Sequence, residues 1–482
     1  MLSIKHNIDM SGGNKLVRNT IIYALGDIIP RLFSFISFPI LTTYLLPADY
    51  GIINYVTTIN TFLTIIGLLG INTYYLVFYY RVDTEEERRK MLGNLDLFLI
   101  IANLFITALF FLVGPALMKS WGSKVDFFPY MALGITTSFF NVFRYLPSAL
   151  FRLKENPLPL TILNVLSGLL TMVGSIVAVV YIKADASSVL TTNLVIAFIF
   201  AIVFFIITNK NAKWNINLTQ IKVALKFSLP LVPGSIAGYL YSTFDRVLIE
   251  KYLTLSDVGI YSTSATLALL LNIVTYGAYQ AFEPYFFKTF GSQSFSGNFE
   301  KVRNTLLCIC LIGALALSCF GEEFFIIFSS ERYRICYLYV PLIVMGCVAS
   351  SMSRMYSTVV TAREKTKINA AITIAGAVVS VSMNIILLRH LGIWAAAISY
   401  VMTFIFVMCA EIYFANIKIR HARSILSTFF AIICMVVLTY FLRIENIYVS
   451  ILVKFVLWSL CSLAIVKITE CDTRLFMGLL KK

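Results

Sequence analysis

Charged side chains are scarce in this sequence. Only 13% of the 482 residues are Asp, Glu, Lys or Arg, whereas 59% are hydrophobic. Soluble domains contain roughly 25% charged residues, so a water-soluble chain of this length is excluded. The charges lie between long apolar runs, and a run of about 20 apolar residues can cross the hydrocarbon core of a bilayer as a helix. The predicted fold class is therefore an all-α polytopic membrane protein.

Histidine is also scarce, and cysteine is unevenly placed. The three histidines are far apart, all nine cysteines lie between Cys308 and Cys471, and no two of them form a CxxC pair. Most of these cysteines fall inside apolar runs, where they are expected to be small buried residues. We therefore expect no metal site and no cofactor. The polar residues 1–19 precede an apolar run that is too long for a cleavable signal peptide.

Fourteen apolar runs have the length of a transmembrane helix. The segments between them are short, and the longest, near 209–225, leaves no room for a soluble catalytic or binding domain. With boundaries approximate, the runs lie near 20–46, 51–79, 94–118, 127–151, 158–182, 188–208, 226–251, 257–287, 303–329, 336–360, 368–389, 392–417, 424–442 and 446–468.

Lysine and arginine alternate between the two sides of these spans. Twenty-six of them fall in the two tails and the even-numbered connections. Because cations are retained on the cytoplasmic side, both termini are predicted to be cytoplasmic. The same distribution argues against nucleic-acid binding, since the cations flank the membrane rather than covering one soluble face. The opposite side has eight cations: Lys119, Lys124, Lys183, Lys251, Arg332, Arg334, Arg389 and Arg443.

An internal repeat organises the chain. Residues 44–52 and 252–260 match at five positions with a constant offset of 208, including Asp49 with Asp257 and Gly51 with Gly259. Arg144 and Arg354 are related by an offset of 210. Because six helices separate the matched elements, the repeats are parallel. The predicted division is a tail (1–19), a six-helix lobe (20–208), a linker (209–225), a second six-helix lobe (226–417), two additional helices (424–468) and a tail (469–482).

Ionisable residues inside the spans are the first candidate site residues, because charges in a membrane are costly and usually face a cavity or a partner. One interpretation is a cationic cavity for an anionic substrate, since guanidinium binds phosphate oxygens in a bidentate fork. The alternative is that the arginines pair structurally or extend to an interface. The candidates are Arg31 with Asp27 one turn before it, Arg144, Arg354 and the adjacent Asp245 and Arg246, with Lys454 the weakest of the set.

A polar stripe on the eighth predicted helix is the second candidate. Asn272, Tyr276 and Gln280, together with Tyr279 and Glu283, recur at helical spacing. In a cavity wall, such a stripe supplies hydrogen-bonding groups and aromatic faces that suit a sugar. The alternative is hydrogen bonding between helices.

A family resemblance rests on three segments. Residues 229–261, with Pro230, Pro233 and the Asp245-Arg246 pair, resemble the seventh and eighth helices of Wzx-type polysaccharide flippases of the MOP exporter superfamily. The turn at Asp49-Tyr50-Gly51 and the connection at 152–155 resemble the family's corresponding loops. The resemblance implies two facing six-helix bundles that alternate between inward-open and outward-open states.

The resemblance also implies a function. The cargo would be an undecaprenyl diphosphate-linked oligosaccharide, moved across the bacterial inner membrane for O-antigen or capsule synthesis. Arg31 would contact its phosphate, and Asp27 or Asp245 would couple transport to an ion gradient. Membrane lipids, a polysaccharide polymerase and chain-length proteins would be its partners, and no nucleic acid. Two alternatives stay open: a MATE-like antiporter of small molecules, and a membrane enzyme of polysaccharide assembly, against which the short loops argue.

Overall fold

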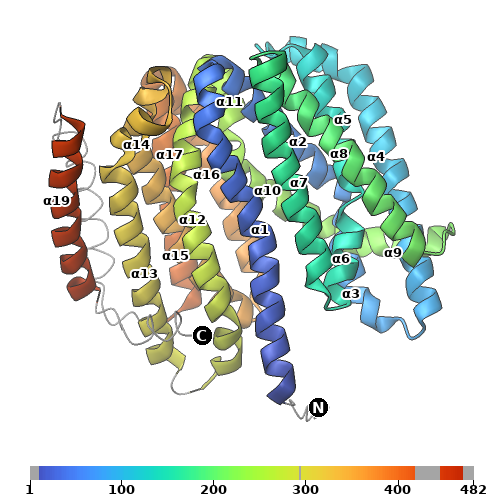
Figure 1. Ribbon diagram of the computed structural model, residues 1–482. Helices are drawn as coiled ribbons and strands as arrows, with labels where there is room; N and C mark the ends of the chain where they lie inside the picture. Colours follow the sequence, from blue (N-terminus) through green and yellow to red (C-terminus); the bar gives the residue numbers. More distant parts are fainter. Residues whose placement is uncertain (1–9, 293–294, 418–445, 470–482) are drawn as a thin grey trace. The chain divides into compact units, whose positions relative to one another are not determined.

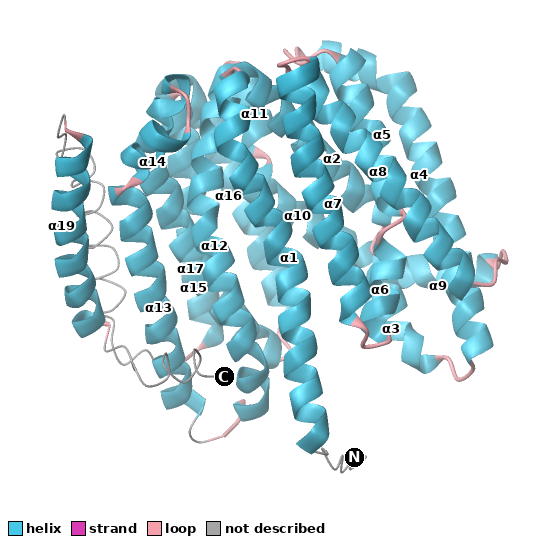
Figure 2. Ribbon diagram, in the orientation of Figure 1, coloured by secondary structure: helices cyan, strands magenta, loops and turns pink. Residues whose placement is uncertain are grey.

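The computed structural model describes residues 10–292, 295–417 and 446–469 (Figure 1). Every regular element in these residues is a helix, and no strand occurs among them (Figure 2). Within these ranges, eleven helices are long and apolar enough to cross a membrane, and a bent pair of helices, which meet at 51°, supplies a twelfth. The protein is thus an all-helical, multi-pass membrane protein, as the scarcity of charge predicted. The expected span at 424–442 lies outside the described residues, so the count of fourteen stays a prediction.

The chain forms two compact units. Unit 1 contains Met1–Leu45 and Ile59–Pro233. Its helices are α1 (Met10–Tyr44), the second part of α2 (Pro47–Leu68), α3 (Ile71–Phe78), η1 (Tyr79–Arg81), α4 (Glu85–Trp121), η2 (Phe127–Met131), α5 (Ala132–Val142), α6 (Tyr145–Leu153), α7 (Pro157–Val177), η3 (Ala178–Ile182), α8 (Ala186–Asn211), α9 (Leu218–Ser228) and η4 (Leu229–Leu231).

Unit 2 contains Leu46–Thr58 and Gly234–Lys482, so the first turns of α2 belong to it. Within it α12, α13 and α15 pack against one another, and α17 packs against α15 and α16 (Figure 1). Its further helices are α10 (Val232–Thr243), α11 (Asp245–Tyr252), α12 (Leu255–Thr289), α13 (Phe295–Cys319), α14 (Gly321–Phe328), η5 (Glu331–Leu338), α15 (Val340–Ala362), α16 (Thr366–Leu391), α17 (Ile393–Ala415) and α19 (Ile447–Ile468).

Several expected spans are broken rather than continuous. The run at 51–79 forms α2 and α3, which are separated by Leu69 (φ 48°) and Gly70 (φ 69°). The run at 226–251 is divided among four short helices, and Pro230, which has no amide hydrogen to donate, lies in the break between α9 and α10. Helix α9 begins at Leu218, so part of the expected linker at 209–225 is already helical. Apolar composition therefore located these spans but not their breaks.

Candidate functional site

Asp27 and Arg31 lie on the exposed side of α1. The other side of α1 packs tightly on α7, since a Cβ atom added at Gly168 would lie 2.8 Å from the Cβ atom of Pro30. Within the described part of the chain, neither Asp27 nor Arg31 forms an ion pair or a side-chain hydrogen bond. The guanidinium group of Arg31 is therefore not occupied by the carboxylate one turn before it, and it can receive an anion.

Arg144 lies at the break between α5 and α6. Its Nη2 atom donates a hydrogen bond to Oδ1 of Asn164, 2.9 Å away on α7. The side chain is exposed, and an amide oxygen does not neutralise its charge. Asn164 thus positions a guanidinium group that keeps donors for a further acceptor.

Arg246 and Asp245 instead form a closed pair at the start of α11. Nη1 of Arg246 lies 3.1 Å from Oδ1 of Asp245, and both side chains are almost fully buried. Tyr261 of α12 donates a hydrogen bond to Oδ2 of Asp245, and its ring lies 5.7 Å from the guanidinium carbon of Arg246. These contacts favour the structural alternative for both residues, because buried ions of opposite charge satisfy each other.

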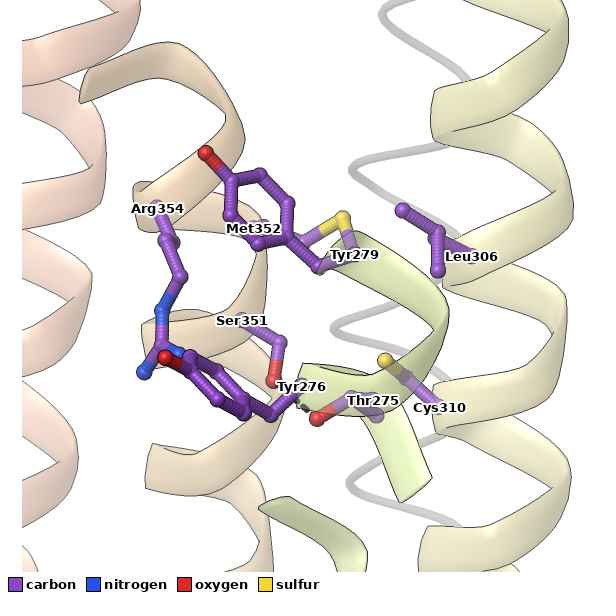
Figure 3. A pocket seen from close by; sticks show the side chains of 8 residues that line it. All are labelled: Thr275, Tyr276, Tyr279, Leu306, Cys310, Ser351, Met352 and Arg354. Atoms are coloured by element: carbon purple, nitrogen blue, oxygen red, sulfur yellow. Dashed lines mark hydrogen bonds between the residues drawn. The ribbon is translucent and has the colours of Figure 1, made fainter. Parts of the chain in front are cut away.

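Arg354 of α15 and Tyr276 of α12 were predicted from separate signals, and the structure brings them together (Figure 3). The guanidinium carbon lies 4.8 Å from the centre of the tyrosine ring, which is cation–π geometry. Tyr276 and Arg354 are both half-buried. No ion pair of Arg354 occurs among the described residues, so its charge has an aromatic face but no carboxylate beside it.

A small pocket adjoins this pair. It is lined by residues of α12, α13 and α15, and its space, about 10 Å³, suits one water molecule rather than a sugar. A hydrogen bond of 3.0 Å between Thr275 and Ser351 joins α12 to α15 beside it (Figure 3). Asn272 of the predicted stripe is half-buried, and the side chain of Gln280 lies outside the described ones. The contact of the stripe with a sugar therefore stays a prediction.

Sequence reasoning missed four carboxylates that are buried among the described residues: Asp96, Glu250, Glu323 and Glu411. Each interrupts an apolar run, which is a signal for a functional or paired group. Glu411 of α17 accepts a hydrogen bond from Ser353 of α15. Glu323 of α14 accepts a hydrogen bond from Lys454 of α19 at 2.6 Å, so Lys454 is a structural partner rather than a cavity residue.

Cationic groups are the chemically notable feature of the predicted site residues. In the described ranges, no group of three or more His, Cys, Asp or Glu side chains could hold a metal ion. Arg31, Arg144 and Arg354 present cationic groups with free donors on membrane-spanning or adjoining helices. Such groups stabilise an anionic ligand inside a membrane, where water cannot solvate it.

Comparisons with known proteins agree with these features. Residues 16–290 match the family model described as polysaccharide biosynthesis protein. Lsg locus putative protein 1 of Haemophilus influenzae is 22% identical over 292 residues, which cover 57% of this chain and 66% of that relative. The match thus spans just under two thirds of the relative's length.

Solved structures with the same fold include two kinds of transporter. The lipid II flippase MurJ in an inward closed conformation has a TM-score of 0.75 at 14% identity, over 93% of this chain and 98% of that chain. An inward-facing multidrug resistance MATE transporter of the MOP superfamily has a TM-score of 0.62 at 14% identity, over 87% and 100%. The Vibrio cholerae MATE transporter VcmN has a TM-score of 0.58 at 14% identity, over 84% and 96%.

Proposed function

Because this chain belongs to the polysaccharide biosynthesis protein family, we propose that it is a flippase for a lipid-linked oligosaccharide. The family match over residues 16–290 is the observation that carries the proposal. The resemblance to Wzx-type flippases of the MOP exporter superfamily, drawn above from residues 229–261, is confirmed by the family match together with the fold shared with a lipid II flippase and MATE transporters.

The proposed cargo is an undecaprenyl diphosphate-linked oligosaccharide repeat unit. The protein would move it from the cytoplasmic to the periplasmic leaflet of a bacterial inner membrane, with both termini in the cytoplasm. A polymerase and chain-length proteins would then use the exported unit. The product would be a surface polysaccharide such as O-antigen or capsule, and an ion gradient would drive the cycle.

The partner-free cations support an anionic cargo. A diphosphate that leaves water must be paired, because an unpaired phosphate in a medium of low polarity is strongly disfavoured. Arg31 has no partner among the described side chains, and Arg354 is stacked on Tyr276 but not neutralised. We assign the diphosphate to Arg31, with Arg144 and Arg354 as further contacts for anionic groups of the cargo.

Reconstitution in liposomes tests this function directly. A fluorescent undecaprenyl diphosphate oligosaccharide is incorporated with the purified protein, and a membrane-impermeant reductant is added outside. Liposomes without protein should lose only the label of the outer leaflet, whereas liposomes with protein should lose all of it. If the two preparations lose the same fraction, under an imposed ion gradient as well as without one, the protein is not a flippase for this cargo.

The two alternatives give different outcomes in the same liposomes. An antiporter of small molecules is one alternative, because MATE transporters share this fold. An antiporter of small molecules would accumulate a cationic dye and leave the labelled lipid in place. A membrane enzyme would change the mass of the lipid-linked sugar, which chromatography of the extracted lipid would detect.

A further inference from the structure

An apolar cluster in unit 1 encloses a carboxylate. Helices α3, α6 and α9 are short pieces of broken spans, and they pack together with the first turns of α4. We call this the half-helix cluster. Asp96 lies on the buried stripe of α4 that faces it and is only 2% exposed. Buried residues of the cluster include Leu68, Ile71, Tyr75, Met91, Leu92, Leu95, Leu99, Leu146, Leu150 and Ala224.

Asp96 has no hydrogen-bond partner for its Oδ2 atom within the described residues, and neither has the hydroxyl of Tyr75 in the same cluster. Other polar residues on α4 are satisfied. Asn94 donates to Oε1 of Gln220 at 2.7 Å, and Asn103 donates to the carbonyl oxygen of Gly67 at 2.9 Å. Oδ2 of Asp96 is thus a buried carboxylate oxygen without a partner beside these satisfied amides, and buried polar groups without partners call for an explanation.

Among the described residues, no cation forms an ion pair with Asp96. Arg88 lies 3.9 Å from Glu85 and donates to the carbonyl oxygen of Val82 at 3.0 Å, so its guanidinium group is engaged at the end of the cluster. Arg89 is half-buried and donates to the carbonyl oxygens of Lys210 and Asn211, and the other cations of the packed helices are exposed. The titratable groups on α3, η1, α4, η2, α6, α8 and α9 besides Asp96 are Tyr74, Tyr75, Tyr79, Tyr80, Arg81, Glu85, Glu86, Glu87, Arg88, Arg89, Lys90, Lys119, Tyr130, Tyr145, Arg152, Lys210, Lys222 and Lys226, and no ion pair with Asp96 occurs among these described residues.

Burial in apolar surroundings favours the neutral, protonated form of the Asp96 side chain. An ionised carboxylate in apolar surroundings without a partner is strongly disfavoured, whereas the neutral acid loses much less on burial. Three other buried acids have partners close by: Asp245 has Arg246, Glu323 has Lys454, and Glu411 has Ser353. Within the part of the chain that the structure describes, no cation pairs with Asp96, so binding a proton is the way to neutralise it.

We propose that Asp96 is a proton-binding residue that couples the packing of the half-helix cluster to the proton gradient. Asp96 takes a proton from water while the cluster is open to one side of the membrane, keeps it while the cluster is closed, and releases it to water when the cluster opens to the other side. The flexible point is the break between α2 and α3 at Leu69 and Gly70, both with positive φ. This inference rests on the proposed transport function, and it differs from the coupling roles predicted for Asp27 and Asp245.

The break between α2 and α3 also lies against the end of α9. A Cβ atom added at Gly70 would lie 2.9 Å from the carbonyl oxygen of Ser228, at the end of that helix. A movement of α3 therefore affects the helix that precedes α10. Through this contact, protonation of Asp96 can affect the segment that leads from the half-helix cluster to Gly234, where the chain enters the longer part of unit 2.

Two neutral variants and one matched control test the proposal. Asp96→Asn and Asp96→Leu both remove the titrating group, and the second needs no hydrogen-bond partner. Asp83→Asn makes the same change at an exposed carboxylate only two residues before α4. In proteoliposomes, transport of the labelled lipid-linked oligosaccharide by wild type and Asp83→Asn should respond to an imposed pH gradient. Transport by both Asp96 variants should lose this response.

Infrared spectroscopy gives a readout that does not need cargo. The absorption of a protonated carboxyl group should be present in wild type and in Asp83→Asn at neutral pH, and should be reduced in Asp96→Leu. Equal bands in wild type and Asp96→Leu, or an unchanged response to the pH gradient in both variants, would overturn the proposal. If wild type moves no lipid-linked oligosaccharide at any pH, the proposed function fails, and the infrared comparison still decides whether Asp96 holds a proton.

Discussion

Gly51 of α2 and Gly259 of α12 lie against each other in a reciprocal contact. A Cβ atom at Gly51 would lie 1.9 Å from the carbonyl oxygen of Leu255, and one at Gly259 would lie 1.9 Å from that of Pro47. Both contact pairs join residues that the offset of 208 makes equivalent, since 47 corresponds to 255 and 51 to 259. Such reciprocity is what a local two-fold relation between repeated elements produces.

We expect Gly51→Ala and Gly259→Ala each to destabilise the protein. Overpacking of a close contact usually costs about 1–3 kcal/mol, and here the obstacle is backbone rather than a flexible side chain. Thermal unfolding in detergent would measure the loss. Gly297→Ala is the control, because a Cβ atom there meets nothing within 4 Å. Unchanged melting of both variants would show that α2 and α12 do not pack this closely.

Lys454 holds α19 to α14 through Glu323. Breaking a buried ion pair by removing one partner costs about 3–5 kcal/mol, whereas replacing both by apolar residues is often neutral. We therefore expect Lys454→Leu to lower the melting temperature and the double variant Glu323→Leu, Lys454→Leu to restore it. If the double variant were as unstable as the single one, packing rather than charge would explain the contact.

Arg354 and Arg246 should respond differently to removal of the charge. Arg354→Ala should lower transport about tenfold while the protein accumulates normally, because a hydrogen bond to a charged group contributes about 1.5–3 kcal/mol. Arg246→Ala should lower protein abundance, because Asp245 remains buried without its cation. Transport normalised to membrane abundance separates the two effects. Normal normalised transport by Arg354→Ala would exclude it as a cargo contact.

Arg31 is expected to be the main phosphate contact. Arg31→Lys keeps the charge but loses the bidentate fork, so transport should be impaired, and Arg31→Ala should be nearly inactive. The double variant Asp27→Ala, Arg31→Ala should stay inactive although it inserts normally. Transport by that stably inserted double variant would exclude Arg31 as a phosphate site and would favour a structural role beside Asp27.

The orientation in the membrane can be checked with reporter fusions. The distribution of lysine and arginine predicts cytoplasmic reporters at Lys213 and Lys481 and a periplasmic reporter at Lys183. A periplasmic reporter at Lys481 would contradict the even number of spans. The reporter at Lys481 also tests the thirteenth span, expected at 424–442, because the side on which Lys481 lies depends on whether that segment crosses the membrane.

The sequence by itself determined that the protein is a bundle of membrane helices. A chain with so few charges and such long apolar runs must satisfy its backbone within each segment, and only helices do this in a continuous apolar run. The repeat was likewise readable from Gly51 and Gly259, because a close helix crossing requires glycine at the point of contact and so leaves a local trace in the sequence.

Only the tertiary structure decided which charged residues have partners. Lys454 is 131 residues away from Glu323, and no local pattern relates the two. Arg246 and Arg354 are both arginines in apolar surroundings, yet one is neutralised by Asp245 and the other stacks on Tyr276. The sequence likewise does not show whether Asp96 has a partner. The pairing of a charge depends on which helices pack around it, and that is a property of the assembled bundle rather than of any one span.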